Sequence, residues 1–181
     1  FGRIHAYYLE YERRILESAR GNVAVLCTGD DFGAQNGLLI SPGSWRRFLG
    51  PGFASYVRLA KEAGVRVMHH TCGAVRALVP DLAARGLDIL HSLQPEAAGM
   101  DPAALKADFG RTLSFQGGIS IQQCLPRGTP ADVREHVRRV FEALAPGGGY
   151  LAGTSHNIQA DTPLANIEAL FAAYRDFGRY R

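Results

Sequence analysis

The chain has 181 residues, of which 46% are hydrophobic and 20% are charged, and its formal net charge is +3. This composition is ordinary for a globular protein and suffices for one well-buried domain over residues 1–181. The positive charges are spread along the chain without a basic block, which argues against nucleic-acid binding. Its apolar runs are too short to cross a bilayer and no signal-peptide pattern is present, so we expect no membrane association.

The three cysteines are an odd number, are widely spaced, and occur in a chain too large to need disulfides for stability. We therefore expect reduced thiols and a cytoplasmic location, with Cys27 and Cys124 as packed thiols. The chain begins with Phe1 rather than methionine, and we expect it to start inside a longer one.

Helical and strand patterns alternate along the whole chain. Helices are indicated by apolar residues at helical spacing and by glycine or proline at their ends, and strands by short, compact apolar runs. The elements expected in chain order are a helix over 4–19 with Tyr7, Tyr8 and Tyr11 as a packing face, a strand over 22–27, a helical segment over 45–64 interrupted near Gly50 and Pro51, a strand from Val65, a helix over 74–85, a strand over 88–93, a helix over 101–109, a strand over 113–116, a helix from Thr129 to Leu144, a strand over 150–153, and a helix to about Phe177 with Thr162 as its N-cap.

Five buried strands that alternate with helices predict a parallel α/β sheet with right-handed crossovers. The pattern alone leaves an open sheet and a barrel as alternatives. An eight-stranded barrel takes about 250 residues, so five βα units in this chain would form the C-terminal portion of a (β/α)8 TIM barrel, without its N-terminal units.

Polar side chains follow the predicted strands at their carboxyl ends, whereas the strand interiors are apolar. The carboxyl ends of parallel strands open on one face, where both barrels and open α/β sheets bind ligands. We therefore expect these polar groups to share one ligand site. They are Asp30 and Asp31, then His70 and Cys72, then His91 and Gln94, then Gln116, and finally Ser155, His156 and Asn157.

The segment Val65–Gly73 ends in a His-x-Cys pair. His70 and Cys72 face the same side of a strand, about 7 Å apart along it. Imidazole and thiolate suit zinc, which needs at least a third protein ligand, and His156 after the fifth strand can reach the same mouth. The resulting His-Cys-His set with one open position is typical of catalytic zinc. The alternative is a structural histidine beside an unliganded thiol.

Asp30 and Asp31 follow the first strand and have two interpretations. They are either catalytic carboxylates or a pair that stabilises a turn and caps a helix.

Several motifs occur in a fixed order along the chain: Asp30–Gly33 through Leu39–Pro42, His70–Gly73, Gly86–Asp88, Gly117–Ile119, and His156 before Asp161–Ile167. Together they resemble the uroporphyrinogen decarboxylase superfamily over nearly the whole chain. That superfamily has a (β/α)8 barrel and contains both cofactor-independent decarboxylases and zinc-dependent methyltransferases that work with corrinoid proteins. The resemblance implies that this chain corresponds to roughly the C-terminal two-thirds of such a barrel.

Within the superfamily, the methyltransferase branch binds zinc through His-x-Cys and a later cysteine. His70 and Cys72 match the first two ligands, and His156 stands at the third position, where the decarboxylases also have histidine. The decarboxylases rely on an N-terminal arginine-rich segment and an aspartate that this chain lacks. The resemblance therefore implies a methyltransferase-like enzyme that transfers a methyl group between a corrinoid protein and a small-molecule thiol.

The assignments that follow are zinc binding by His70, Cys72 and His156, catalysis by Asp30, Asp31 and His156, and substrate binding by Gln35, His91, Gln94 and Gln116. One alternative is a metal-free carboxy-lyase acting on a tetrapyrrole, in which Asp30 or Asp31 polarises a pyrrole-like nitrogen. Another is an inactive, truncated barrel. Since an incomplete barrel exposes sheet edges, we also expect self-assembly, for example as a homodimer.

Overall fold

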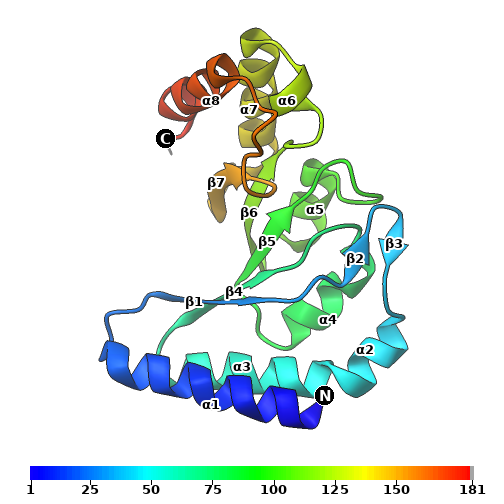
Figure 1. Cartoon of the computed structure of the whole chain (residues 1–181), viewed down its shortest axis with the longest axis vertical. Coiled ribbons are helices and arrows are strands. Elements are labelled where there is room, and N and C mark those ends of the chain that lie inside the picture. The colour runs from blue at the N-terminus through cyan, green and yellow to red at the C-terminus, as the bar shows by residue number, and fades with distance from the viewer. Residues whose placement is uncertain (180–181) are drawn as a thin grey trace.

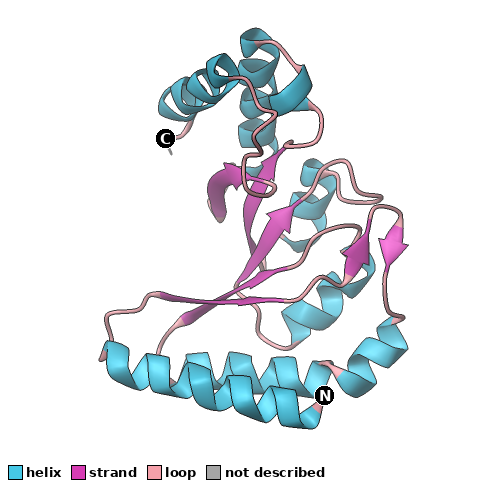
Figure 2. Ribbon diagram, in the orientation of Figure 1, coloured by secondary structure: helices cyan, strands magenta, loops and turns pink. Residues whose placement is uncertain are grey.

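The computed structural model describes residues 1–179. Its main sheet has five parallel strands in the order β1-β4-β5-β6-β7. Figure 2 shows this sheet crossing the molecule as one twisted layer. The strands are β1 (Val25–Gly29), β4 (Arg66–His70), β5 (Ile89–Leu93), β6 (Ser114–Ile119) and β7 (Tyr150–Thr154).

The helices lie between successive strands and at both ends of the sheet. Figure 1 shows α1 and α3 side by side near β1, and α7 and α8 packed together beyond β6 and β7. The α-helices are α1 (Gly2–Ala19), α2 (Pro42–Phe48), α3 (Gly50–Glu62), α4 (Val79–Ala84), α5 (Pro102–Phe109), α6 (Cys124–Arg127), α7 (Pro130–Leu144) and α8 (Leu164–Phe177), and a 3-10 turn, η1 (Arg76–Leu78), precedes α4. Among residues 1–179, no helix is both long and apolar enough to span a membrane.

The order of the strands distinguishes a barrel-type sheet from a doubly wound one. Each new strand pairs with the strand before it, without reversal. A doubly wound sheet reverses direction at a switch point, whereas a barrel adds every strand to the same side. The predicted α/β fold, with five βα units of the barrel type, is therefore confirmed.

The hydrophobic core lies on one face of the sheet, beneath the helices. In β4, Val67 and His69 are buried, while Met68 and His70 on the opposite face are half-buried. The strands predicted to be buried differ in how far they are covered: four of the five residues of β5 are buried, whereas only Leu26 is buried in β1 and only Tyr150 in β7. Cys27 of β1 points to this less covered face and is exposed, not packed as predicted.

Several predicted boundaries differ from the structure. The first strand begins at Val25 rather than Asn22, and the helix expected over 74–85 is shorter because a 3-10 turn precedes it. The sequence analysis also missed the two-residue strands β2 (Gly33–Ala34) and β3 (Gly37–Leu38), which form an antiparallel hairpin.

The two helix starts predicted from Thr-Pro pairs have different outcomes. Thr129 caps α7 as expected, in a capping box with Asp132. Thr162 does not cap α8: Pro163 occupies the N-cap position, and the buried Thr162 hydroxyl has no hydrogen-bond partner in the described part of the chain.

The predicted packing face of α1 is also wrong. Helix α1 packs against α3, and Leu16 is its buried residue. Tyr7, Tyr8 and Tyr11 point elsewhere and are 68%, 51% and 54% exposed.

Candidate metal centre

The His-x-Cys pair lies where β4 ends and its following loop begins. His70 is the last residue of the strand, and Thr71 and Cys72 follow it outside regular secondary structure. The two side chains converge: His70 Nε2 is 3.4 Å from Cys72 Sγ, which is less than the spacing of about 7 Å along an extended strand. Both residues are half-buried, so their donor atoms remain within reach of a ligand.

Residues after β1 hold this loop in place. Asp31 Oδ1 accepts a hydrogen bond from the Cys72 backbone N–H at 2.9 Å and lies 3.7 Å from His70 Nε2. In the other direction, Thr71 Oγ1 accepts from the Phe32 backbone N–H at 3.0 Å. The carboxylate of Asp31 therefore touches both members of the His-x-Cys pair, which gives it a positional role in addition to the catalytic one predicted.

Gln35 and Gln94, predicted to bind substrate, form a relay that supports the same loop. Gln94 Oε1 accepts from the Gly73 backbone N–H at 3.1 Å, and Gln94 Nε2 donates to Gln35 Oε1 at 3.0 Å. Gln35 Nε2 in turn donates to the Glu96 carbonyl at 2.8 Å. Because their amide groups already pair with the protein, the geometry gives both residues a structural task, and substrate binding by them remains a prediction.

His156 joins the pair from the far side of the sheet, two residues after β7. The ligating atoms of His70, Cys72 and His156 all lie within 4.8 Å of one another. The His156 ring is exposed, and its centroid is 5.8 Å from that of His70. Two imidazoles and one thiol are a donor set that zinc prefers, so these residues fit the ion. The structure thus brings together the three predicted ligands, which are far apart in the sequence.

His91 of β5 completes the group of imidazoles. Its register partner in β4 is His70, and the Nδ1 atoms of the two rings are 3.2 Å apart. Burial, with a smaller contribution from His70 and His156, lowers the pKa of His91 to about 4. His91 is therefore neutral at physiological pH.

The electrostatics favour neutral side chains before a cation binds. Burial lowers the pKa of His70, although the carboxylate of Asp31 opposes this effect. Burial and the negative charge of Asp31 raise the pKa of Cys72, so its thiol is protonated near neutral pH. A cation at this site would reverse the preference of the thiol, because a coordinating thiol is deprotonated.

The remaining two predicted residues are Asp30, which contacts the His70 backbone, and Gln116. Burial, followed by the charge of Asp31, raises the pKa of Asp30, and the Asp30 backbone N–H donates to the His70 carbonyl at 3.0 Å. Gln116 of β6 has a buried Oε1 without a hydrogen-bond partner among the described residues. A buried acceptor without a partner is uncommon in proteins, and substrate binding by Gln116 remains a prediction.

Two residues that the sequence analysis did not assign also belong to this region. Thr71 fixes the loop as described, and Ser92 Oγ lies 3.9 Å from Cys72 Sγ. Thr71 lies inside the His70–Gly73 motif, but the motif gives it no role, and Ser92 lies in a predicted strand without any motif. Their contacts follow from the register of neighbouring strands, which the chain order alone does not reveal.

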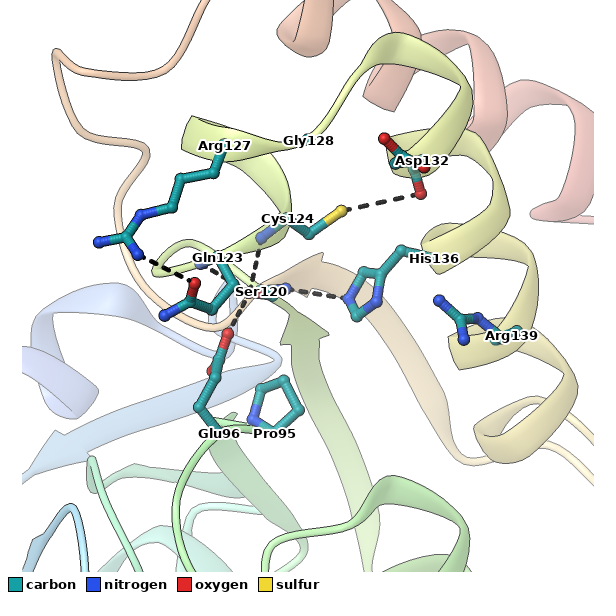
Figure 3. Close-up of a pocket in the computed structure, with 10 residues that line it drawn as sticks. All are labelled: Pro95, Glu96, Ser120, Gln123, Cys124, Arg127, Gly128, Asp132, His136 and Arg139. Carbon is teal, nitrogen blue, oxygen red and sulfur yellow. Dashed lines mark hydrogen bonds between the residues drawn. The ribbon is translucent and has the colours of Figure 1, made fainter.

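A separate cavity of about 480 Å³ lies beside the start of α7, and none of the predicted site residues lines it (Figure 3). Its polar groups largely pair with one another. Ser120 donates to the Glu96 carboxylate, and the Ser120 backbone N–H donates to His136 Nε2 at 3.1 Å. Cys124, predicted to be a packed thiol, is half-buried in the wall of this cavity.

Comparison with known proteins now identifies the family. The sequence model of the uroporphyrinogen decarboxylase (URO-D) family matches residues 10–177. The chain belongs to this family. It is 27% identical over 141 residues to the methylated-thiol–coenzyme M methyltransferase of Methanosarcina mazei, a match that covers 76% of this chain and 34% of that protein.

A solved structure described as a methyltransferase from Methanosarcina mazei has the same fold. It matches with a TM-score of 0.68 and 25% sequence identity, over 86% of this chain and 43% of that chain. The chain therefore spans less than half the length of either relative. Both similarities place this member of the URO-D family in its methyltransferase-like branch, as the sequence motifs predicted.

Proposed function

We propose that this chain carries the metal centre of a zinc-dependent methyltransferase, which transfers a methyl group between a corrinoid protein and a thiol acceptor. The observation that carries the proposal is the convergence of His70, Cys72 and His156 donor atoms within 4.8 Å. The methyltransferase names of the two relatives support the type of reaction.

Each ligand has a distinct chemical task in this proposal. His70 supplies a neutral imidazole near pH 7, because burial lowers its pKa. Cys72 must give up its proton to bind a cation, so zinc uptake releases a proton and becomes tighter as the pH rises. Asp31 keeps the Cys72 backbone in position through the 2.9 Å hydrogen bond.

His156 is the most accessible of the three ligands, and it lies at the mouth formed by the carboxyl ends of the strands. Three protein ligands leave one position open for an exogenous thiol. Zinc bound there would lower the pKa of such a thiol, so that the acceptor reacts as a thiolate.

The first test is the zinc content of the purified protein. We expect about one zinc per chain in the wild type, as for a single catalytic site, and a stoichiometric loss in Cys72→Ser and His156→Ala. Cys27→Ser is the matched control, since it removes a thiol from the same sheet outside the cluster and should leave the zinc content unchanged. A wild type without zinc, or a Cys72→Ser variant that retains it, would contradict the proposal.

The second test is methyl transfer itself. Methylcobalamin serves as the corrinoid donor, and coenzyme M, which the name of the Methanosarcina mazei relative contains, serves as the thiol. We expect product formation that stops after chelation and returns on addition of zinc. Activity on a porphyrinogen that survives both chelation and Cys72→Ser would instead support the carboxy-lyase alternative.

A further inference from the structure

The two nitrogens of the His70 ring face different neighbours. Nε2 lies 3.4 Å from Cys72 Sγ, on the side of the proposed zinc ligands. Nδ1 lies 3.2 Å from Nδ1 of His91, which is on the adjacent strand at the paired position. The two rings meet edge to face, with centroids 4.8 Å apart and an interplanar angle of 64°.

This arrangement constrains the position of protons. A neutral imidazole carries one N–H and one lone pair, and a metal binds only the nitrogen that has the lone pair. Two nitrogens 3.2 Å apart attract each other only if one of them donates a proton to the other. If His70 is to present the Nε2 lone pair beside Cys72, its own proton must be on Nδ1 and His91 Nδ1 must accept it.

We propose that His91 is a positioning residue for the metal centre: its Nδ1 accepts the Nδ1–H of His70 and thereby holds His70 in the tautomer and orientation that direct Nε2 toward the ion. This inference deepens the proposed function and rests on His70 being a zinc ligand. Metal-binding histidines generally donate their second N–H to such an acceptor, and loss of the acceptor lowers metal affinity by about 10–100-fold.

The geometry also argues against His91 as a fourth ligand. Its contact is with the ring nitrogen of His70 that points away from Cys72 Sγ. Among the described residues, the group able to hold an ion consists of His70, Cys72 and His156, and His91 is outside it. The substrate-binding role predicted from the sequence would have to use the other ring nitrogen of His91, because its Nδ1 is paired with His70.

Two substitutions separate the acceptor function of His91 from its bulk. His91→Leu fills much of the same space but removes the acceptor. His91→Asn keeps a short side chain whose amide oxygen can take the place of Nδ1. We expect zinc affinity, measured by competition with a chelator, to fall about 10–100-fold in His91→Leu and to stay within a few-fold of the wild type in His91→Asn.

A spectroscopic readout on the metal-free protein tests the tautomer directly. Long-range proton–nitrogen correlation spectra with labelled histidine distinguish a ring nitrogen that carries a proton from one that does not. We expect the His70 proton on Nδ1 in the wild type and in His91→Asn, and a mixture of tautomers in His91→Leu. A wild type with the proton on Nε2 would overturn the proposal, whether or not zinc binds.

The remaining outcomes assign a failure to one proposal or the other. If the wild type binds no zinc, the proposed function fails and the role of His91 fails with it. If the wild type binds zinc and His91→Leu binds it equally well, only the role of His91 is refuted. If the absorption bands of the cobalt-substituted protein change in His91→Leu as they do in His156→Ala, His91 is itself a ligand, which also refutes a positioning role. Thermal melts of both variants verify that they fold.

Discussion

His69 and His70 are consecutive residues of β4, but they face opposite sides of the sheet and have different environments. His70 lies on the open face with the proposed zinc ligands. The His69 ring is buried between two phenylalanines: its centroid is 5.2 Å from the ring centroid of Phe32 and 5.1 Å from that of Phe53. Its Nδ1 is 2.7 Å from Thr28 Oγ1. Since side chains alternate along a strand, one histidine supports the core and its neighbour serves the site.

The burial of His69 predicts an acid-sensitive fold. Burial lowers its pKa from 6.5 to about 3, so the unfolded chain takes up a proton at a higher pH than the folded chain. The contribution of neutral, buried His69 to the free energy of unfolding is fully present above pH 6.5 and is lost as the pH falls toward 3. Between pH 7 and pH 4.5, we expect the free energy of unfolding of the wild type to fall by roughly 2–3 kcal/mol more than that of His69→Asn.

Urea denaturation of both proteins in the presence of a chelator measures this difference. The chelator removes any contribution from metal binding at the neighbouring His70. Other titrating groups affect both proteins equally, so the comparison isolates His69. Parallel stability curves for the two proteins would show that the burial of His69 does not couple folding to pH.

At the level of elements, the site depends on a close approach between the β2–β3 hairpin and the loop after β4. The backbone of Gly73 has a φ of +81°, and a Cβ atom at this position would lie 2.5 Å from the carbonyl carbon and oxygen of Gly33. The Ala74 backbone N–H donates to the Ala34 carbonyl at 2.8 Å in the same contact. Only glycine meets both requirements, because it tolerates positive φ and has no side chain to displace the hairpin.

Gly73→Ala should therefore destabilise the fold and weaken the proposed metal centre together. Gly64→Ala is a matched control, since Gly64 also has a positive φ, of +71°, but has no atom within 4 Å of an added Cβ. We expect the control to lose about 1 kcal/mol from backbone strain alone, and Gly73→Ala to lose at least about twice as much. Thermal melts and zinc affinity measure both effects. Equal losses in the two variants would mean that the hairpin contact is unimportant.

Some features of these elements can be predicted from local sequence patterns, and others cannot. Thr129 and Asp132 form a cap through residues three positions apart, and the sequence predicted this helix start. The β2–β3 hairpin turns at Gln35 and Asn36, so the Asn36-Gly37 pair is displaced by one position from the two central turn positions where such a pair indicates a hairpin. By contrast, the contact of Gly73 with Gly33 and the pairing of His70 with His91 depend on strand register, which no local pattern specifies.

At the scale of the whole molecule, parallel strands added in chain order explain why residues from 31 to 156 meet at one end of the sheet. Motif order and strand polarity were sufficient to predict that His70, Cys72 and His156 would meet. They were not sufficient to predict which side chains would be occupied by hydrogen bonds within the protein, as for Gln35 and Gln94. The outer strands β1 and β7 each pair with one neighbour in the five-stranded sheet, so the expected self-assembly remains a prediction.

The predicted single domain requires the two ends of the molecule to unfold together. The hydrophobic core is continuous from Leu16 in α1 to Ala173 in α8. Trp45, the one tryptophan of the chain, is buried in α2 near one end, and Phe32, Phe53 and Arg85 surround its ring. Its fluorescence therefore reports the α1–α3 end of the molecule, whereas far-ultraviolet circular dichroism reports all helices, including α7 and α8.

We expect the two signals to give one coincident transition during thermal or urea unfolding, because elements that share a core lose their contacts cooperatively. For a chain of this length, a single transition has an enthalpy of about 120 kcal/mol at its midpoint. Excitation at wavelengths that avoid the seven tyrosines isolates the Trp45 signal. Sedimentation at the same concentrations verifies that dissociation of an oligomer does not mimic unfolding. A Trp45 transition that precedes the dichroism signal would mean that the α1–α3 end unfolds independently, and that residues 1–181 are two cooperative units.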